Sequence, residues 1–89
     1  MDFAWDPKKA AANLRKHGVA FEEASTVFCD TLSVSGADPD HSVGERRFTF
    51  GVSNIGRLIV VSDNDEVVTI RIINARVATR RERKIYGEG

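Results

Sequence analysis

The fold of this chain is decided by one stretch in its second half, 46-RRFTFGVSNIGRLIVV-61. Phe48, Phe50 and Val52 alternate there with polar or small residues, which is the period of a strand with one buried face. The residues 54–56 (Asn-Ile-Gly) then favour a hairpin loop, and residues 58–61 form an apolar run typical of a central strand. The stretch therefore predicts an antiparallel hairpin.

The register of this hairpin predicts which side chains share a face. A loop centred on Ile55 would pair Phe50 with Val60 and turn both toward the helices. The opposite face would carry Arg47, Thr49 and Gly51. Arg71 is expected on that opposite face too, beside the bare backbone of Gly51, in a shallow hollow that could take a phosphate. A slip of one residue would reverse every side chain.

Downstream of the hairpin, residues 63–65 (Asp-Asn-Asp) indicate a turn and residues 67–73 indicate a third strand. Thr79 and Glu82 have the spacing of a capping box, which predicts a short helix continuing to about Tyr86.

Upstream of the hairpin, two helices are expected after an extended start at residues 3–5. Asp6 and Pro7 favour a first helix that continues to about Lys16, with Ala10, Leu14 and part of His17 buried and Gly18 ending it. A second helix is predicted over residues 21–28, although Ala20 is a poor cap, and residues 35–40 are expected to form a long loop.

These elements predict one α+β domain spanning residues 1–89, with two N-terminal helices and a short C-terminal helix packed on an antiparallel β-meander. Hydrophobic residues make up 42% of the chain, which is ordinary for a folded soluble protein. The longest apolar stretch is far shorter than the roughly 20 residues that a membrane helix needs, so a cytoplasmic location is expected. Cys29 is the only cysteine, and we expect it to be packed rather than paired or metal-bound.

The charges cancel overall but are distributed unevenly. Residues 1–44 hold seven acidic and four basic side chains, whereas residues 45–89 hold six acidic and nine basic ones. Six bases and a single acid fall between Arg71 and Lys84. Such a segment is suited to contact with a polyanion.

Short motifs are spread over nearly the whole chain, namely Phe3-x-Trp5-Asp6-Pro7-x-Lys9, Asn13-x-x-Lys16-His17-Gly18-Val19, Phe21-Glu22-Glu23-Ala24, Glu45-Arg46-Arg47, Gly51, Gly56-Arg57-Leu58, Arg71-Ile72-Ile73 and Ala75-Arg76-x-Ala78-Thr79-x-x-Glu82-Arg83-x-x-Tyr86. In this order and spacing they resemble the BrnT toxin family. The resemblance implies a RelE-like fold and a ribonuclease that halts translation. It also implies a BrnA-type antitoxin partner with a ribbon-helix-helix DNA-binding region, forming a hetero-oligomer with an antitoxin dimer. One departure is Asn74, where the family tends to have serine.

A ribonuclease without a metal can use the 2′-hydroxyl of its substrate as nucleophile, and then needs groups that move protons and cations around the phosphate. His17 is the best candidate for proton transfer because an imidazole exchanges protons near neutral pH, and Lys16 would add charge. The alternative is that His17 stabilises the helix dipole or packs at the edge of the core. The other candidate catalytic residues are Glu45, Arg47, Arg71 and Arg76, with simple solvation of Arg47 and Arg71 as the alternative.

Candidate RNA-binding residues are Arg80 and Arg81 at the start of the last helix, together with Arg46. Cations oppose the dipole at a helix start, so either an RNA phosphate or the acidic pair Glu22 and Glu23 should compensate them. No metal and no other cofactor are expected, since Asp38, Asp40 and His41 offer no fixed ligand geometry. A binding module without catalysis, using the same basic surface, is the alternative function.

Overall fold

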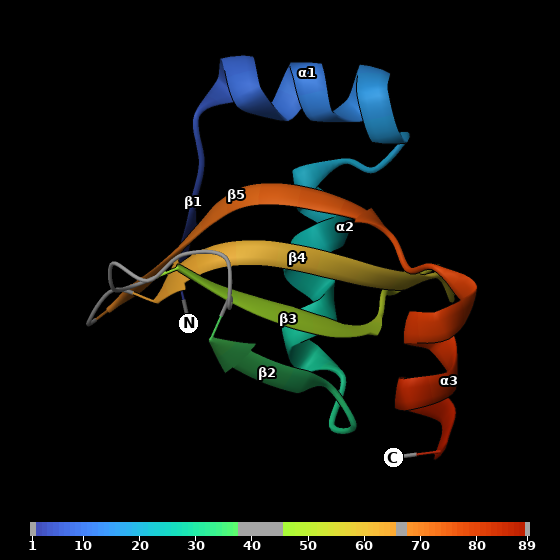
Figure 1. Cartoon of the computed structure of the whole chain (residues 1–89). Helices are drawn as coiled ribbons and strands as arrows, with labels where there is room; N and C mark the ends of the chain where they lie inside the picture. Colours follow the sequence, from blue (N-terminus) through green and yellow to red (C-terminus); the bar gives the residue numbers. More distant parts are fainter. Residues whose placement is uncertain (1, 38–45, 66–67, 89) are drawn as a thin grey trace.

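The computed structural model describes residues 2–37, 46–65 and 68–88, which form a five-stranded sheet with helices on both faces (Figure 1). The order of the strands across the sheet is β1-β5-β4-β3-β2. None of the described helices is long and apolar enough to cross a membrane. In chain order the elements are β1 (Asp2–Ala4), α1 (Pro7–His17), α2 (Phe21–Thr26), the 3-10 helix η1 (Val27–Cys29), β2 (Val34–Ala37), β3 (Arg46–Val52), β4 (Leu58–Asp65), β5 (Thr69–Val77) and α3 (Arg80–Glu88).

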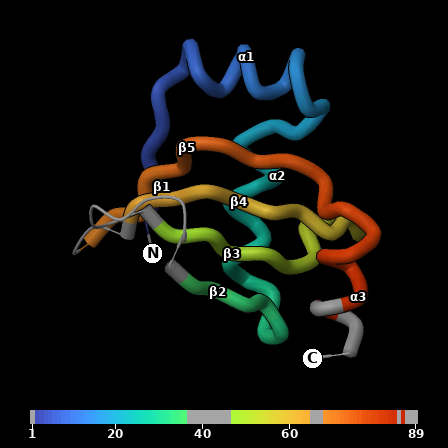
Figure 2. The backbone as a smooth tube through the Cα atoms, viewed as in Figure 1, coloured from blue at the N-terminus to red at the C-terminus, as the bar shows by residue number. Residues whose placement is uncertain are grey.

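The sheet is mixed, so the prediction of a simple antiparallel meander is wrong. Strands β2 to β5 do follow one another in antiparallel order, but β1 pairs in parallel with β5, with Phe3 opposite Ile70 (Figure 2). The extended start of the chain was predicted, whereas its partner strand lies 67 residues further along the chain and has no local signal. The expected RelE-like architecture stays a prediction.

Strand β2 replaces the first part of the loop that was expected at residues 35–40. Its backbone pairs with β3 from Val34 opposite Phe50 to Ala37 opposite Arg47, and the hydroxyls of Ser35 and Thr49 lie 2.8 Å apart. Serine, glycine and alanine have little strand propensity of their own, so pairing with β3 overrides the local sequence. Residues 38–40 lie outside the described residues.

Helix α1 has the predicted ends, and Ala10 packs against the core as predicted, but Leu14 does not. The Asp6 carboxylate accepts a hydrogen bond of 2.9 Å from the backbone N–H of Lys8, and Gly18 ends the helix with a φ of 68°. Leu14, which was expected in the core, is 51% exposed, whereas Asn13 is 5% exposed. The prediction for Leu14 failed because it followed apolar spacing, whereas a polar side chain holds this helix to the sheet.

The other two helices lie near their predicted positions. Helix α2 and η1 together cover residues 21–29, and Ala20 makes no side-chain capping bond, as expected. Before α3, the Thr79 N–H donates to Glu82 Oε1 at 2.8 Å and the Glu82 N–H donates to Thr79 Oγ1 at 3.2 Å. The predicted capping box is confirmed, although α3 extends to Glu88. Cys29 is exposed, contrary to the expectation that it is packed.

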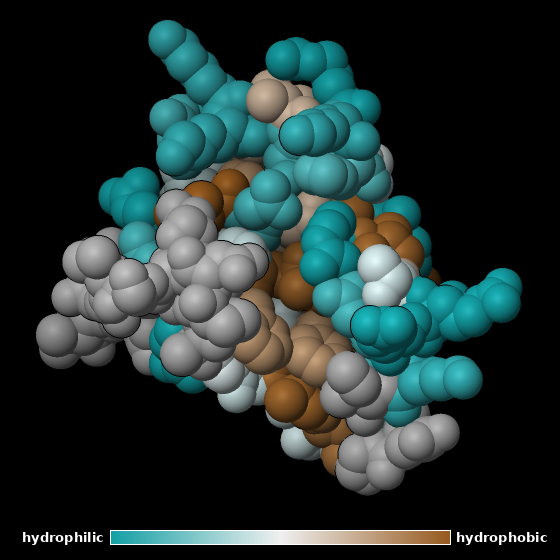
Figure 3. All heavy atoms as spheres, viewed as in Figure 1, coloured by the Kyte–Doolittle hydropathy of each residue, from teal (hydrophilic) through white to brown (hydrophobic). Residues whose placement is uncertain are grey.

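Two apolar clusters lie on opposite faces of the sheet. Neighbouring residues of a strand point to opposite faces. Ile59 and Val61 of β4 therefore pack with Phe21 of α2, while Val60 between them packs with Tyr86 of α3. Figure 3 shows hydrophilic side chains over α1 and along the α3 side, with hydrophobic residues visible between them.

The predicted hairpin register is confirmed, but the open environment predicted for one of its two faces is wrong. Phe50 pairs with Val60 as expected, and both lie in the cluster that α3 covers. Thr49 and Gly51, expected on an open face, are buried. A Cβ at Gly51 would lie 2.9 Å from Ser33 Cβ and 3.0 Å from Asp30 Oδ2, so the hollow proposed there for a phosphate is already filled.

Replacing Gly51 with alanine is expected to cost about 1–3 kcal/mol of unfolding free energy, because the added methyl group overpacks the contact with Ser33 and Asp30. Gly36→Ala is the matched control on β2. Its Cβ would meet only the ring of Phe48, at 3.2 Å or more, and that ring can shift. Urea unfolding of both variants checks the prediction, and equal losses would contradict it.

Candidate functional site

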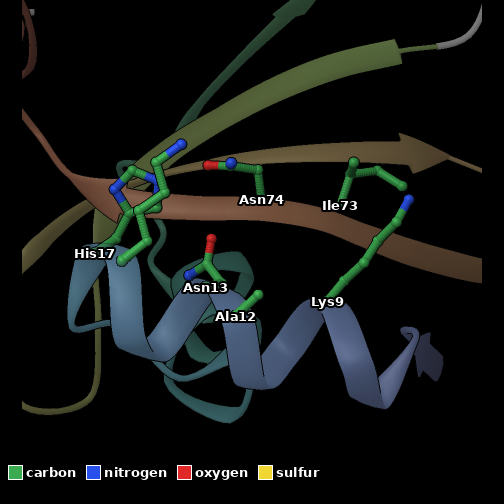
Figure 4. Close-up of a pocket in the computed structure, with 7 residues that line it drawn as sticks. Lys9, Ala12, Asn13, His17, Ile73 and Asn74 are labelled. Carbon is green, nitrogen blue, oxygen red and sulfur yellow. The ribbon is translucent and has the colours of Figure 1, made fainter.

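A shallow groove of about 190 Å³ lies between α1 and β5. Five residues of α1 line it at helical spacing, so they share one face of the helix. Ile73 and Asn74 of β5 form the opposite wall. Figure 4 shows Lys9 and His17 rising from α1 on either side of Asn13, with Asn74 facing them from β5. The residues from α1 are Lys9, Ala12, Asn13, Lys16 and His17.

The groove brings together three basic side chains, two of which the sequence analysis assigned to catalysis. Lys9 and Lys16 are exposed, whereas His17 is partly buried. Lys16 and His17 are in the last turn of α1, where the helix dipole favours positive charge. That stabilisation is compatible with catalysis, because His17 still lines a groove open to solvent.

Asn13 fixes the floor of the groove. Its Nδ2 donates to the carbonyl oxygens of Val19 at 2.9 Å and Ala75 at 2.8 Å, while its Oδ1 accepts from the Ala75 N–H at 3.1 Å. The Asn13 amide thus pairs with the backbone N–H and C=O of Ala75, as a neighbouring strand would. It does so at the edge of β5 beyond Arg71, where the pairing with β1 ends. Since both its donor hydrogens are used, Asn13 positions the groove rather than binding a ligand.

The end of α1 that carries His17 is braced by Arg57, from the β3–β4 hairpin. Arg57 Nη2 donates to the carbonyl oxygen of Gly18 at 3.0 Å, directly after His17. Its Nε donates to Glu23 Oε2 at 3.0 Å, its Nη2 forms an ion pair with Glu23 Oε1, and Ser53 donates to the same carboxylate at 2.7 Å. The Arg57 guanidinium lowers the pKa of Glu23. Glu23 is therefore engaged by Arg57, and does not offset Arg80 and Arg81 as the sequence analysis considered.

Arg76 lies further along β5, on the same face as Asn74. Its Nη1 and Nη2 donate to the two oxygens of Glu82 at 2.7 and 2.8 Å, a bidentate pair. The Arg76 guanidinium is the main reason why the pKa of Glu82 is lowered to about 2, and the hydrogen bonds from Thr79 contribute. The pair holds Arg76 rigidly at the junction of β5 and α3.

Glu82→Gln is expected to cost about 1–2 kcal/mol at pH 7, a figure reduced for solvent screening because the side chains of Arg76 and Glu82 are 38% and 26% exposed. The folded-state pKa lies below the ordinary value of 4.5, so this stabilisation is full above about pH 5 and is lost as the pH falls toward 2. The stability gap between wild type and variant should therefore close over that range. Unfolding midpoints at a series of pH values measure it, with exposed Glu22→Gln as the control for charge; a gap independent of pH would contradict the assignment.

The remaining predicted site residues lie elsewhere. Arg71 is opposite Asn64 and Ala4, two residues before Ile73, and so lies toward the Lys9 end of the groove rather than beside Gly51. The row that contains Gly51 continues through Ile59 to Val77, about 20 Å along β5 from Arg71. The predicted juxtaposition failed because β4 continues to Asp65, through the turn that was expected at residues 63–65. The longer hairpin changes the register, so Arg71 pairs opposite Asn64, at the far end of the sheet from Gly51.

Arg46 and Arg47 are on β3, separated from β5 by β4, with Arg47 opposite Asp63. Arg80 and Arg81 are exposed in the first turn of α3. Glu45 and His41 lie outside the described residues. The guanidinium groups of the predicted site therefore lie in separate places: two toward opposite ends of β5, two on β3 and two on α3. They do not form the single arginine face that was expected.

Sequence reasoning missed Lys9, Asn13 and Asn74. All three fall within motifs that carried the family resemblance or next to them, and the helical spacing from Lys9 to His17 was an available signal. Within residues 2–37, 46–65 and 68–88, no three His, Cys, Asp or Glu side chains are grouped so that they could hold a metal ion.

The protein has an α+β fold with a mixed sheet, and one groove is lined by an imidazole and two ammonium groups. Such a groove is suited to contact with a phosphodiester. The model of the family described as "Ribonuclease toxin, BrnT, of type II toxin-antitoxin system" matches residues 5–82, so the chain belongs to this family of ribonuclease toxins. No curated protein matches the chain.

The fold is also similar to that of the Brucella abortus ribonuclease toxin BrnT, known from a crystal structure at 1.1 Å resolution. The TM-score is 0.70 at 20% sequence identity, and the match covers 90% of this chain and 99% of that one. At this identity the likeness concerns the fold. The family resemblance seen in the sequence is confirmed by the family model, which matches residues 5–82.

Proposed function

We propose that this toxin cleaves RNA without a metal, in the groove between α1 and β5, and that cleavage inhibits translation. The observation that supports the proposal is that His17 lines one groove with Lys9 and Lys16. An imidazole can move a proton, and two flexible ammonium groups can stabilise the extra negative charge on a phosphate under attack. Family membership supports RNA as the substrate.

The proposed reaction is an internal transesterification. The 2′-hydroxyl oxygen of one nucleotide attacks the adjacent phosphorus, His17 accepts the hydroxyl proton, and the bond from phosphorus to the 5′-oxygen of the next nucleotide breaks. The departing oxygen takes a proton from solvent or from the imidazolium of His17. The products are a 2′,3′-cyclic phosphate and a 5′-hydroxyl.

In this proposal the two lysines contact the non-bridging phosphate oxygens. Arg71, which precedes the groove on β5, attracts the strand at that end. Arg76 follows the groove, and its bidentate pair with Glu82 offsets its charge. The predicted roles of Arg47 in the reaction and of Arg46 in RNA binding receive no support from the groove, since neither residue lines it. Glu45 lies outside the described residues.

Cleavage of a defined RNA with and without EDTA tests the proposal. We expect cleavage to be equal in both, with a cyclic phosphate on the 5′ fragment and inhibition of translation in a cell-free system. Loss of cleavage in EDTA, or ends with a 3′-hydroxyl, would contradict the proposed chemistry. RNA binding without cleavage would favour the alternative of a non-catalytic binding module.

We also propose that a BrnA-type antitoxin dimer with a ribbon-helix-helix region neutralises the toxin in the cytoplasm by covering the basic groove. Opposite charge at such a surface excludes RNA from the same site. Purified complex should then be inactive until the antitoxin is digested away, and full activity of the intact complex would contradict the proposal.

A further inference from the structure

We propose that a second hollow, on α3, is an anion-binding subsite that holds the substrate strand beyond the bond that is cleaved. The hollow has a volume of about 360 Å³ and is lined by Ala78, Arg80, Arg83 and Lys84. The inference rests on the proposed function, because it takes the groove between α1 and β5 as the place of cleavage. Neither family membership nor the similar structure assigns these residues a role.

The spacing of the three cations places them on one side of α3. Arg80, Arg83 and Lys84 stand at positions i, i+3 and i+4 of the helix, so their side chains share a face. Arg81, which the sequence analysis grouped with Arg80, does not line the hollow. Both carboxylate oxygens of Glu82 accept hydrogen bonds from Arg76, and one also accepts from Thr79. The charge of Glu82 is therefore paired with Arg76 and does not neutralise the three cations of the hollow.

Strand β5 connects the hollow to the groove. Asn74 lines the groove and Ala78 lines the hollow, while Arg76 lies between them. Asn74 pairs with Ser62 and Arg76 with Val60, so alternate residues of β5 carry this path on one face of the sheet. Four residues of strand span about 13 Å. A strand leaving the groove would need only a few nucleotides to pass Arg76 and reach α3.

The side chains of the hollow indicate binding rather than chemistry. Arginine and lysine stay charged near neutral pH, so these groups attract phosphates without exchanging protons. Phosphate contacts of this kind fix the position of a strand but do not read its bases. The subsite should therefore raise affinity for RNA of any sequence, and the rate of cleavage at saturating RNA should not depend on it.

The double variant Arg80→Ala/Arg83→Ala tests the subsite. We would measure the affinity of the variant for a short 2′-O-methyl RNA, which can bind but lacks the nucleophile needed for cleavage. Each lost phosphate contact lowers the slope of log affinity against log salt by about 0.7 for a single strand. We expect the slope to fall by about 1.4. For cleavable RNA, KM should rise at least tenfold at low salt, with kcat changed less than threefold.

Arg15→Ala is the matched control, because Arg15 is an exposed cation of α1 outside the groove lining. Its salt slope should stay that of the wild type. Arg80→Lys/Arg83→Lys should retain the wild-type slope, since it keeps both charges, and a shared thermal midpoint would show that the variants are folded.

A slope for the double alanine variant equal to that of Arg15→Ala would overturn the subsite. The same holds if RNA binding is unchanged but binding of an acidic protein partner is lost, since α3 would then be a protein interface. Either result leaves the proposed function standing. That function fails separately if the wild type does not cleave RNA.

Discussion

Replacing Asn13 with aspartate is expected to lower the free energy of unfolding by about 3–5 kcal/mol, because it leaves an uncompensated charge in a buried site. The two shapes are nearly the same, but the carboxylate has no hydrogen to donate. It would face the carbonyl oxygens of Val19 and Ala75, which now accept from Nδ2 at 2.9 and 2.8 Å. Only the bond from the Ala75 N–H would remain.

Chemical unfolding at pH 7 measures this loss. Leu14→Ala is the control, since its side chain is 51% exposed on the same helix and should change stability by less than about 0.5 kcal/mol. Apolar spacing alone predicts the reverse order, with Leu14 the more sensitive of the two. If Asn13→Asp unfolds like the wild type, α1 is held to β5 by something other than this amide.

The second large effect is on activity. His17→Gln is expected to lower kcat for RNA cleavage by about 10²–10⁴-fold, the usual contribution of a positioned group that moves protons. Glutamine keeps a polar side chain at the end of α1 but has no group that exchanges protons near neutral pH. The KM should change little, because the lysines of the groove are untouched.

Single-turnover cleavage by the variant gives the rate, and its circular dichroism and unfolding midpoint show whether it is folded. His41→Gln, at the only other histidine of the chain, should cleave at the wild-type rate. A folded His17→Gln protein with wild-type kcat would remove His17 from the reaction. Lys9 and Lys16 would then have to be tested as the groups that matter.

Local signals predicted most of the helices and strands. The alternation of Phe48, Phe50 and Val52 predicted β3, the loop centred on Ile55 predicted the pairing of Phe50 with Val60, and the Thr79–Glu82 box predicted the start of α3. Each of these depends on residues within about ten positions of one another. Strand β2 was missed because its strand character comes from pairing with β3.

The candidate site was predicted only in part. His17 and Lys16 were chosen for their chemistry and for the family resemblance, and both line the groove. The arginines were expected to gather on one face, but the register of β5 against β4 and the ion pair of Arg76 with Glu82 divide them. Local spacing cannot predict this, because it says nothing of which strands become neighbours or which charges find partners.

The sequence by itself determined the α+β class, the ends of α1, the β3–β4 register and membership of the ribonuclease toxin family, since all of these depend on short patterns and motifs. Tertiary structure alone decided that β1 joins β5 in parallel, that Asn13 rather than Leu14 faces the sheet, and that Lys9 and Asn74 share a groove with His17. The physical reason is the same in each case. Backbone donors and acceptors at the edge of β5 must be paired, and the groups that pair them are distant in the chain.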